Sequence, residues 1–141
     1  MTIYADSSFI VSLYVTDSHS VSSRQRIGTV SRAWWTPLHA AEWAHAITQH
    51  VFRGSVSLDE EREVYRQLKE DKLSGLWRET QMPENAFDLC ADLARRYGPK
   101  LGVRTLDSLH VACALELKAE RFWTFDERQA KLAKAEGLKT S

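Results

Sequence analysis

Short β-prone runs alternate with longer helix-like segments along almost the whole chain, and this alternation constrains the fold more than any other feature. Parallel strands need crossover connections, and helical crossovers cover both faces of the sheet. The sequence therefore predicts an α/β fold of three layers, α/β/α, with a central, mostly parallel sheet of roughly five strands. The expected strands are Thr2–Ala5, Thr29–Thr36, Leu76–Thr80, Phe122–Phe125 and Gly137–Thr140.

Helices are expected between these strands, each identified by apolar residues at helical spacing. The segment from about Thr105 or Asp107 to Lys118 is apolar on most sides and should be buried. The segment from Pro83 should end at Tyr97, before Gly98-Pro99, because proline disfavours continuation of a helix. The other expected helices are Phe9–Tyr14, a helix that begins at Pro37, a charged helix that follows Ser57 and ends at about Lys72, and Glu127–Glu136.

The size of the chain suits a single domain spanning residues 1–141, with 43% hydrophobic residues to form one core. Nineteen basic and nineteen acidic side chains cancel, which argues against a nucleic-acid binder that relies on a strongly positive field. If RNA is the partner, local geometry must provide the recognition.

The two cysteines, Cys90 and Cys113, lie inside apolar helical patterns without the spacing of a zinc site, and we interpret them as buried free thiols of a reducing cytosol. The N-terminus shows no basic leader and no long apolar stretch. We therefore expect a cytoplasmic protein with no membrane partner.

Four acidic residues stand against apolar surroundings: Asp6 after the first strand, Glu42 inside a small apolar helix face, Asp107 at the start of the apolar helix, and Asp126 after Phe122–Phe125. Ligands of open α/β sheets bind at the carboxyl ends of the strands, where Asp6 and Asp126 are expected. Clustered carboxylates are tolerated when a divalent cation compensates their charge. All-oxygen ligation favours Mg²⁺ or Mn²⁺ over zinc.

Taken one at a time, these acids have simpler explanations. Asp6, Asp107 and Asp126 each stand where a side chain can cap the start of a helix. Glu42 lies inside a helix, where it is either part of a site or a rim residue that faces water. The combination of all four, rather than any single acid, indicates a metal site.

Four segments of the sequence resemble the signature blocks of PIN-domain proteins, in the same order, and the likeness is greatest to the VapC toxins of bacterial toxin–antitoxin pairs. The resemblance covers essentially the whole chain. The segments are Ile3-Tyr-Ala-Asp-Ser-Ser-Phe-Ile, Pro37-Leu-His-Ala-Ala-Glu-Trp, Leu106-Asp-Ser-Leu-His-Val-Ala-Cys-Ala and Phe122-Trp-Thr-Phe-Asp.

This resemblance implies that Asp6, Glu42, Asp107 and Asp126 are the catalytic acids. It implies Mg²⁺ or Mn²⁺ as the cofactor, held by the three aspartates, with Glu42 acting through water. Two hydroxyls match supporting positions of the family, Ser8 and Thr124.

The same resemblance implies hydrolysis of RNA phosphodiester bonds, a cognate antitoxin that keeps the enzyme silent, and a homodimer. The dimer would form through the region Ser57–Leu73 or through the Trp-rich neighbourhood of Glu42. The alternatives are a PIN fold that binds RNA or a partner without cutting, and a housekeeping RNA-processing nuclease.

Basic side chains near the acids are candidates for contact with RNA phosphates or with antitoxin carboxylates. They are Arg96, Arg104 and Arg128, with a solvated surface loop as the alternative for the first two. His110 and His39 invite a catalytic interpretation, but the apolar surroundings of His110 favour a structural histidine with its hydrogen bonds satisfied.

Overall fold

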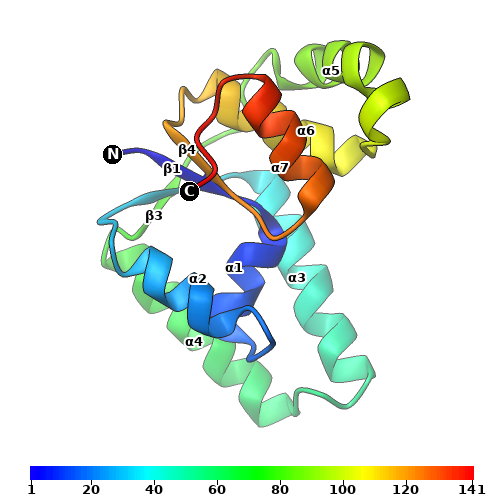
Figure 1. Ribbon diagram of the computed structural model, residues 1–141. Helices are drawn as coiled ribbons and strands as arrows, with labels where there is room; N and C mark the ends of the chain where they lie inside the picture. Colours follow the sequence, from blue (N-terminus) through cyan, green and yellow to red (C-terminus); the bar gives the residue numbers. More distant parts are fainter. The chain divides into compact units, whose positions relative to one another are not determined.

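The computed structural model describes all residues from Met1 to Ser141 and divides into two compact units. The first unit contains residues 1–6 and 81–141, and the second contains residues 7–80. In the colours of Figure 1 the first unit joins the blue N-terminal strand to the yellow-green through red part of the chain. The chain passes from one unit to the other twice, between Asp6 and Ser7 and between Thr80 and Gln81.

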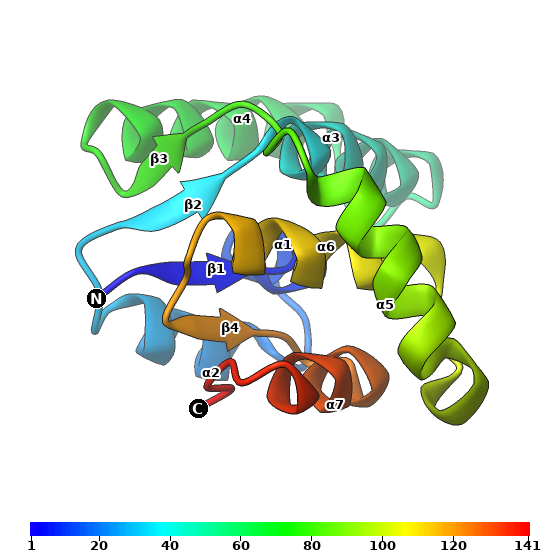
Figure 2. The same cartoon turned by 90° about the horizontal axis from the view of Figure 1, so that it is seen from above.

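The first unit is built on two parallel strands, β1 (Ile3–Ala5) and β4 (Arg121–Trp123), which run side by side in Figure 2. Ile3 pairs with Arg121 and Ala5 pairs with Trp123. Both strands are short, and except for Arg121 at the start of β4 their residues are buried and apolar, as expected for parallel strands covered on both faces. Three helices complete this unit: α5 (Ala86–Leu101), α6 (Thr105–Glu116) and α7 (Glu127–Ala135).

Helix α6 forms much of the core of the first unit, because every side chain from Asp107 to Ala114 is buried. This confirms the helix predicted to be apolar on most sides. Both cysteines are free and buried, as predicted, and Cys90 donates a hydrogen bond to the carbonyl of Thr105 at the start of α6.

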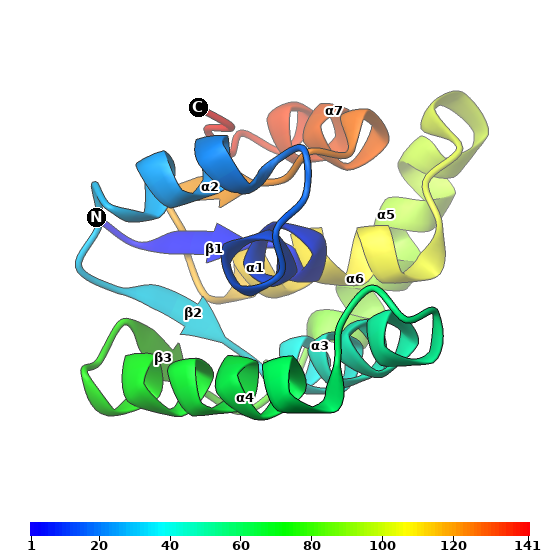
Figure 3. The ribbon, with the colours of Figure 1, turned by 90° about the horizontal axis from the view of Figure 1, so that it is seen from below.

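The second unit contains a second parallel pair of strands, and its helix α4 lies along β3 (Figure 3). Two of its helices begin with capping boxes, in which Thr36 and Ser57 each exchange hydrogen bonds with the third residue of the helix. The elements are α1 (Ser7–Tyr14), α2 (Ser20–Ile27), β2 (Ala33–Trp35), α3 (Pro37–Phe52), α4 (Leu58–Leu73) and β3 (Trp77–Glu79).

Aromatic side chains form the core of the second unit. Trp43 on α3 is 2% exposed and meets Tyr14, Trp35 and Tyr65 in edge-on contacts, with ring centroids 4.9–6.4 Å apart. Edge-to-face packing of this kind stabilises aromatic clusters beyond the area they bury. Trp43 therefore fixes the rotation of α3, the helix that carries Glu42.

The α/β class and the parallel pairing of the strands agree with the prediction, but three details differ. Helix α2 was not predicted, because Ser20–Ile27 has no apolar periodicity and its buried residues are Ser20 and Ser23. Helix α5 continues through Pro99 to Leu101, and Gly102 ends it in the left-handed conformation with φ +64°. Instead of a fifth strand, the C-terminal segment makes one isolated parallel bridge between Lys139 and Arg121.

No helix combines the length and the apolar character that crossing a membrane requires.

The buried thiols should be unreactive toward thiol reagents in the folded protein. Burial raises the pKa of the Cys113 thiol to about 11, and burial also raises the pKa of Cys90. At pH 8 about one Cys113 side chain in a thousand is therefore the reactive thiolate. We expect a thiol reagent such as DTNB to modify neither cysteine of the native protein within minutes at pH 8, and to modify both in guanidinium. Rapid modification of either thiol without denaturant would contradict the burial described here.

Candidate active site

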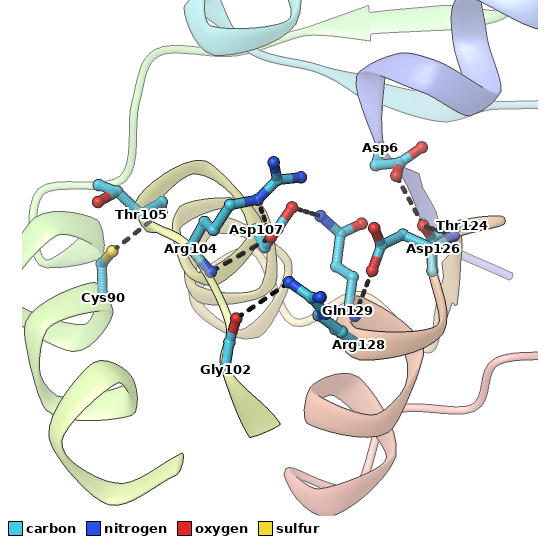
Figure 4. Close-up of polar contacts among 10 residues, drawn as sticks. All are labelled: Asp6, Cys90, Gly102, Arg104, Thr105, Asp107, Thr124, Asp126, Arg128 and Gln129. Carbon is cyan, nitrogen blue, oxygen red and sulfur yellow. Dashed lines mark hydrogen bonds and ion pairs between the residues drawn. The ribbon is translucent and has the colours of Figure 1, made fainter. Parts of the chain in front are cut away.

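The parallel register of β1 and β4 brings the residues after them together. Because Ala5 pairs with Trp123, Asp6 and Thr124 stand next to each other where the strands end. The Asp6 amide donates to the Trp123 carbonyl at 3.0 Å, and the Thr124 hydroxyl donates to Asp6 Oδ2 at 2.6 Å. Asp6 is only 5% exposed. Its carboxylate is thus held at the carboxyl ends of the strands, as predicted (Figure 4).

Asp126 is tied to the same threonine. Its backbone amide donates to Thr124 Oγ1 at 3.0 Å, so this hydroxyl accepts from Asp126 while it donates to Asp6. The carboxylate of Asp126 caps α7, with Oδ1 accepting from the Gln129 amide at 2.9 Å. The capping role foreseen as an alternative for Asp126 is therefore real, and it coexists with a place beside Asp6.

Asp107 joins this group through Gln129. It occupies the third position of α6, where Oδ2 accepts from the Arg104 backbone amide at 3.3 Å and from Arg104 Nε at 3.4 Å. Its other oxygen, Oδ1, accepts from Gln129 Nε2 at 3.3 Å. A continuous series of hydrogen bonds thus runs from Asp6 through Thr124, Asp126 and Gln129 to Asp107 (Figure 4).

The electrostatic character of this group is negative. Asp107 forms an ion pair with Arg104, but the Arg104 side chain is 75% exposed, and exposed pairs contribute little. No three acidic, histidine or cysteine side chains are close enough together in the structure to hold an ion as they stand. The three aspartates are linked through Thr124 and Gln129 instead. Asp6 and Asp107 are buried and Asp126 is partly buried, and carboxylates in such surroundings attract a compensating cation.

Glu42 and Ser8 lie in the second unit. Glu42, on α3, is partly buried and accepts a hydrogen bond from the Ser7 hydroxyl at 2.8 Å. Ser7 is the first residue of α1 and directly follows Asp6 in the chain. Ser8 is exposed, and together with Ser7 and Glu42 it lines a cavity of about 280 Å³. The Glu42 carboxylate is therefore fixed by a hydrogen bond and lies at a concave surface. It is not an isolated residue that simply faces water.

The three arginines have different surroundings. Arg128 is exposed, and its Nη1 reaches the Gly102 carbonyl at 3.5 Å. Arg96 forms ion pairs with Asp92 at 2.8 Å and with Glu136 at 2.9 Å, and thereby ties α5 to the end of α7. The Arg96 guanidinium lowers the pKa of Glu136. Arg96 therefore has carboxylate partners within the fold, whereas Arg104 and Arg128 keep exposed donors.

Both conspicuous histidines serve the fold. His110 is 3% exposed and shares a hydrogen bond with the Tyr4 hydroxyl at 2.8 Å, which agrees with the structural role expected for it. His39 is fully buried, and its Nδ1 accepts from the Thr36 amide at 2.9 Å in the capping box of α3.

Two polar contacts of the acids were not foreseen in the sequence, those of Gln129 and Ser7. The sequence did contain a signal for Gln129: it lies on the face of α7 that buries Leu132 and Ala133, where an apolar residue would be ordinary. Ser7 carries no comparable signal. Its hydrogen bond to Glu42 joins residues 35 positions apart, and no local sequence pattern predicts such a contact.

The sequence matches the PIN domain family over residues 3–135. No curated protein matches it significantly.

Solved structures with a similar fold cover nearly the whole chain. VapC20 of Mycobacterium tuberculosis, described as a toxin that cleaves the sarcin–ricin loop, is 13% identical with a TM-score of 0.70, over 99% of this chain and 98% of that one. FitAcB of Neisseria gonorrhoeae is 14% identical with a TM-score of 0.72, over 99% and 96%. VapBC2 of Rickettsia felis, bound to a DNA fragment from its promoter, is 14% identical with a TM-score of 0.67, over 100% and 98%. At these identities the similarity concerns the fold.

Proposed function

Because the chain belongs to the PIN domain family, we propose that it is a Mg²⁺- or Mn²⁺-dependent endoribonuclease that hydrolyses RNA phosphodiester bonds. Parallel strands flanked by helices agree with the α/β fold of that family. The observation that carries the proposal is the series of hydrogen bonds that links Asp6, Asp126 and Asp107 within one compact unit. A structural role for each acid alone would not require them to be linked.

The donor set suits a hard divalent cation. Asp6, Asp107 and Asp126 offer carboxylate oxygens, and neither histidine nor cysteine takes part in the series, which favours Mg²⁺ or Mn²⁺ over zinc. We assign the cation to these three aspartates, with Glu42 acting through water. When bound, such a cation lowers the pKa of an attacking water and stabilises negative charge on the leaving oxygen.

The side chains of the protein have separate tasks in this scheme. Thr124 donates its proton to Asp6 Oδ2 and thereby fixes the orientation of this carboxylate. The capping bond from Gln129 holds Asp126 Oδ1, and Arg104 holds Asp107 Oδ2. Ser7 orients Glu42, while Ser8 is exposed for contact with the substrate. No histidine is needed as a general base, and the products carry 5′-phosphate and 3′-hydroxyl ends.

We further propose that this nuclease is the toxin of a toxin–antitoxin pair. An antitoxin segment that placed a basic side chain beside the buried aspartates would compete with the cation and silence the enzyme. Exposed donors of Arg104 and Arg128 would meet RNA phosphates or antitoxin carboxylates. The action of VapC20 on the sarcin–ricin loop makes structured ribosomal RNA a rational first probe. We also propose that the protein acts in the cytoplasm, where its RNA substrate would be found.

We propose that both units form one domain over residues 1–141 and that two copies associate as a homodimer. The helical region Ser57–Leu73 is the better-supported surface. Large apolar side chains are exposed in and next to it, with Phe52 93%, Leu58 65% and Leu73 80% accessible. Leu58 and Leu73 are the first and last residues of α4, so exposed apolar side chains at both ends of this helix support the choice of this surface.

Removal of divalent cations should abolish cleavage reversibly. We expect EDTA-treated protein to leave total bacterial RNA and a sarcin–ricin stem–loop intact, and addition of Mn²⁺ or Mg²⁺ to restore cutting, whereas Ca²⁺ should support it poorly because its larger, flexible shell fits the site less well. The measurement is the initial cleavage rate against cation concentration, with mapping of the product ends. Full activity in EDTA, or products with 2′,3′-cyclic phosphates, would refute the metal-dependent scheme.

A further inference from the structure

Gln129 is an unusual residue for the position it occupies. It is 2% exposed and lies with Leu132 and Ala133 on the buried face of α7. Glutamine is mostly an exposed residue in proteins, and a buried carboxamide needs partners for its donors and its acceptor. Packing alone therefore does not explain a glutamine on this face.

The hydrogen bonds of Gln129 connect two of the candidate acids. Its backbone amide donates to Asp126 Oδ1 at 2.9 Å, and its side-chain Nε2 donates to Asp107 Oδ1 at 3.3 Å. In Figure 4 the carboxamide lies between the two carboxylates. The backbone bond would survive almost any substitution, so the bond to Asp107 is what glutamine adds.

The remaining atom of the carboxamide has no partner. Gln129 Oε1 is fully buried and accepts no hydrogen bond. An unsatisfied buried acceptor destabilises a fold, and an apolar side chain of similar volume would avoid that cost. Stability alone therefore does not favour glutamine here, whereas an acceptor facing a hydrated cation would be satisfied when the cation binds.

We propose that Gln129 is a positioning residue for the divalent cation: its Nε2 holds the Asp107 carboxylate in register with Asp126, and its Oε1 accepts a hydrogen bond from the cation's hydration water. This inference rests on the proposed function. The start of α7 then has two roles in the site. Asp126 is a ligand of the cation, and Gln129 keeps the ligands Asp107 and Asp126 together. Partners that orient metal ligands typically change metal affinity 10- to 100-fold when they are removed.

The test is Mn²⁺ binding by titration calorimetry, without RNA, to wild-type protein and to Gln129→Leu. Gln81→Leu is the matched control, because Gln81 is exposed in the loop before α5. We expect Gln129→Leu to bind Mn²⁺ at least 10-fold more weakly than wild type and to unfold at the same temperature or higher. Gln81→Leu should bind as wild type does. In cleavage assays, Gln129→Leu should need about 10-fold more Mn²⁺ and regain its rate at saturation.

The outcomes separate the two proposals. Wild-type protein that binds no Mn²⁺ would refute the metal site itself, and the role of Gln129 with it. Tight binding by wild type and equally tight binding by a folded Gln129→Leu variant would refute only the role of Gln129. If Gln129→Leu does not fold, Gln129→Met preserves the length of the side chain, and wild-type Mn²⁺ affinity in that variant would overturn the inference.

Discussion

Replacing Asp6 with asparagine should lower the rate of RNA cleavage by roughly 10³-fold while the protein stays folded. Asparagine has nearly the same shape and keeps one oxygen that can accept the hydrogen bond from Thr124. It removes the negative charge that a cation requires. Because Asp6 is buried near two other carboxylates linked to it, loss of that charge should leave the melting temperature unchanged or raise it in the absence of metal.

The matched control is Asp59→Asn, because the Asp59 side chain is 94% exposed at the start of α4. It should cleave at the wild-type rate. Initial rates on total bacterial RNA in saturating Mn²⁺, together with thermal melts, provide the comparison. Cleavage by Asp6→Asn within a few-fold of wild type would remove Asp6 from the site.

The same pair of variants also tests the toxin role. Expression of the wild-type chain or of Asp59→Asn should arrest bacterial growth, and Asp6→Asn should not. A housekeeping nuclease would cleave RNA in vitro without arresting growth. A protein that binds RNA without cutting would show no difference between the variants in vitro. Each result therefore favours a different one of the three functions.

Replacing Trp43 with alanine should destabilise the fold by about 3–5 kcal/mol, the usual cost of truncating a large buried aromatic residue. The side chain is 2% exposed and packs against Tyr14, Trp35 and Tyr65. For a domain of this size the melting temperature should fall by roughly 10–20 °C. Urea denaturation followed by circular dichroism measures the effect.

Trp43→Phe is the corresponding control. The indole Nε1 of Trp43 is buried without a hydrogen-bond partner, so phenylalanine removes an unsatisfied donor along with one ring. The two effects oppose each other, and we expect a change of about 1 kcal/mol or less. Alanine and phenylalanine variants of equal stability would show that the aromatic cluster does not hold α3.

Much of the fold follows from local sequence patterns. The apolar triplet Ile3–Ala5 marks β1, the apolar pair Phe122 and Trp123 marks β4, and the hydrophobic run after Asp107 marks a buried helix. What the patterns do not contain is tertiary context. Helix α2 is stabilised by serines, one of which donates from Ser20 Oγ to the Ser12 carbonyl, and Pro99 is accommodated in the last turn of α5. Neither outcome can be deduced from apolar spacing.

The candidate site shows a similar division. The positions of Asp6 and Asp126 at strand ends could be predicted, because parallel strands end at one edge of a sheet. The bond between Gln129 and Asp107 joins two helices, 22 residues apart in the chain. Such a contact depends on side-chain conformations in the folded protein. The sequence therefore predicts a group of acids, but not the glutamine that links two of them.

The double role of Asp126 has a consequence for the evolution of such chains. Its carboxylate begins helix α7, and replacing an N-cap residue with alanine costs about 1 kcal/mol even where no catalysis is involved. A descendant that had lost its nuclease activity would still be under selection to keep this aspartate, whereas the Asp6 carboxylate would be free to drift toward asparagine or serine. The order in which acids disappear from a lineage would then record the loss of activity, with Asp6 as the informative position and Asp126 as the last to change.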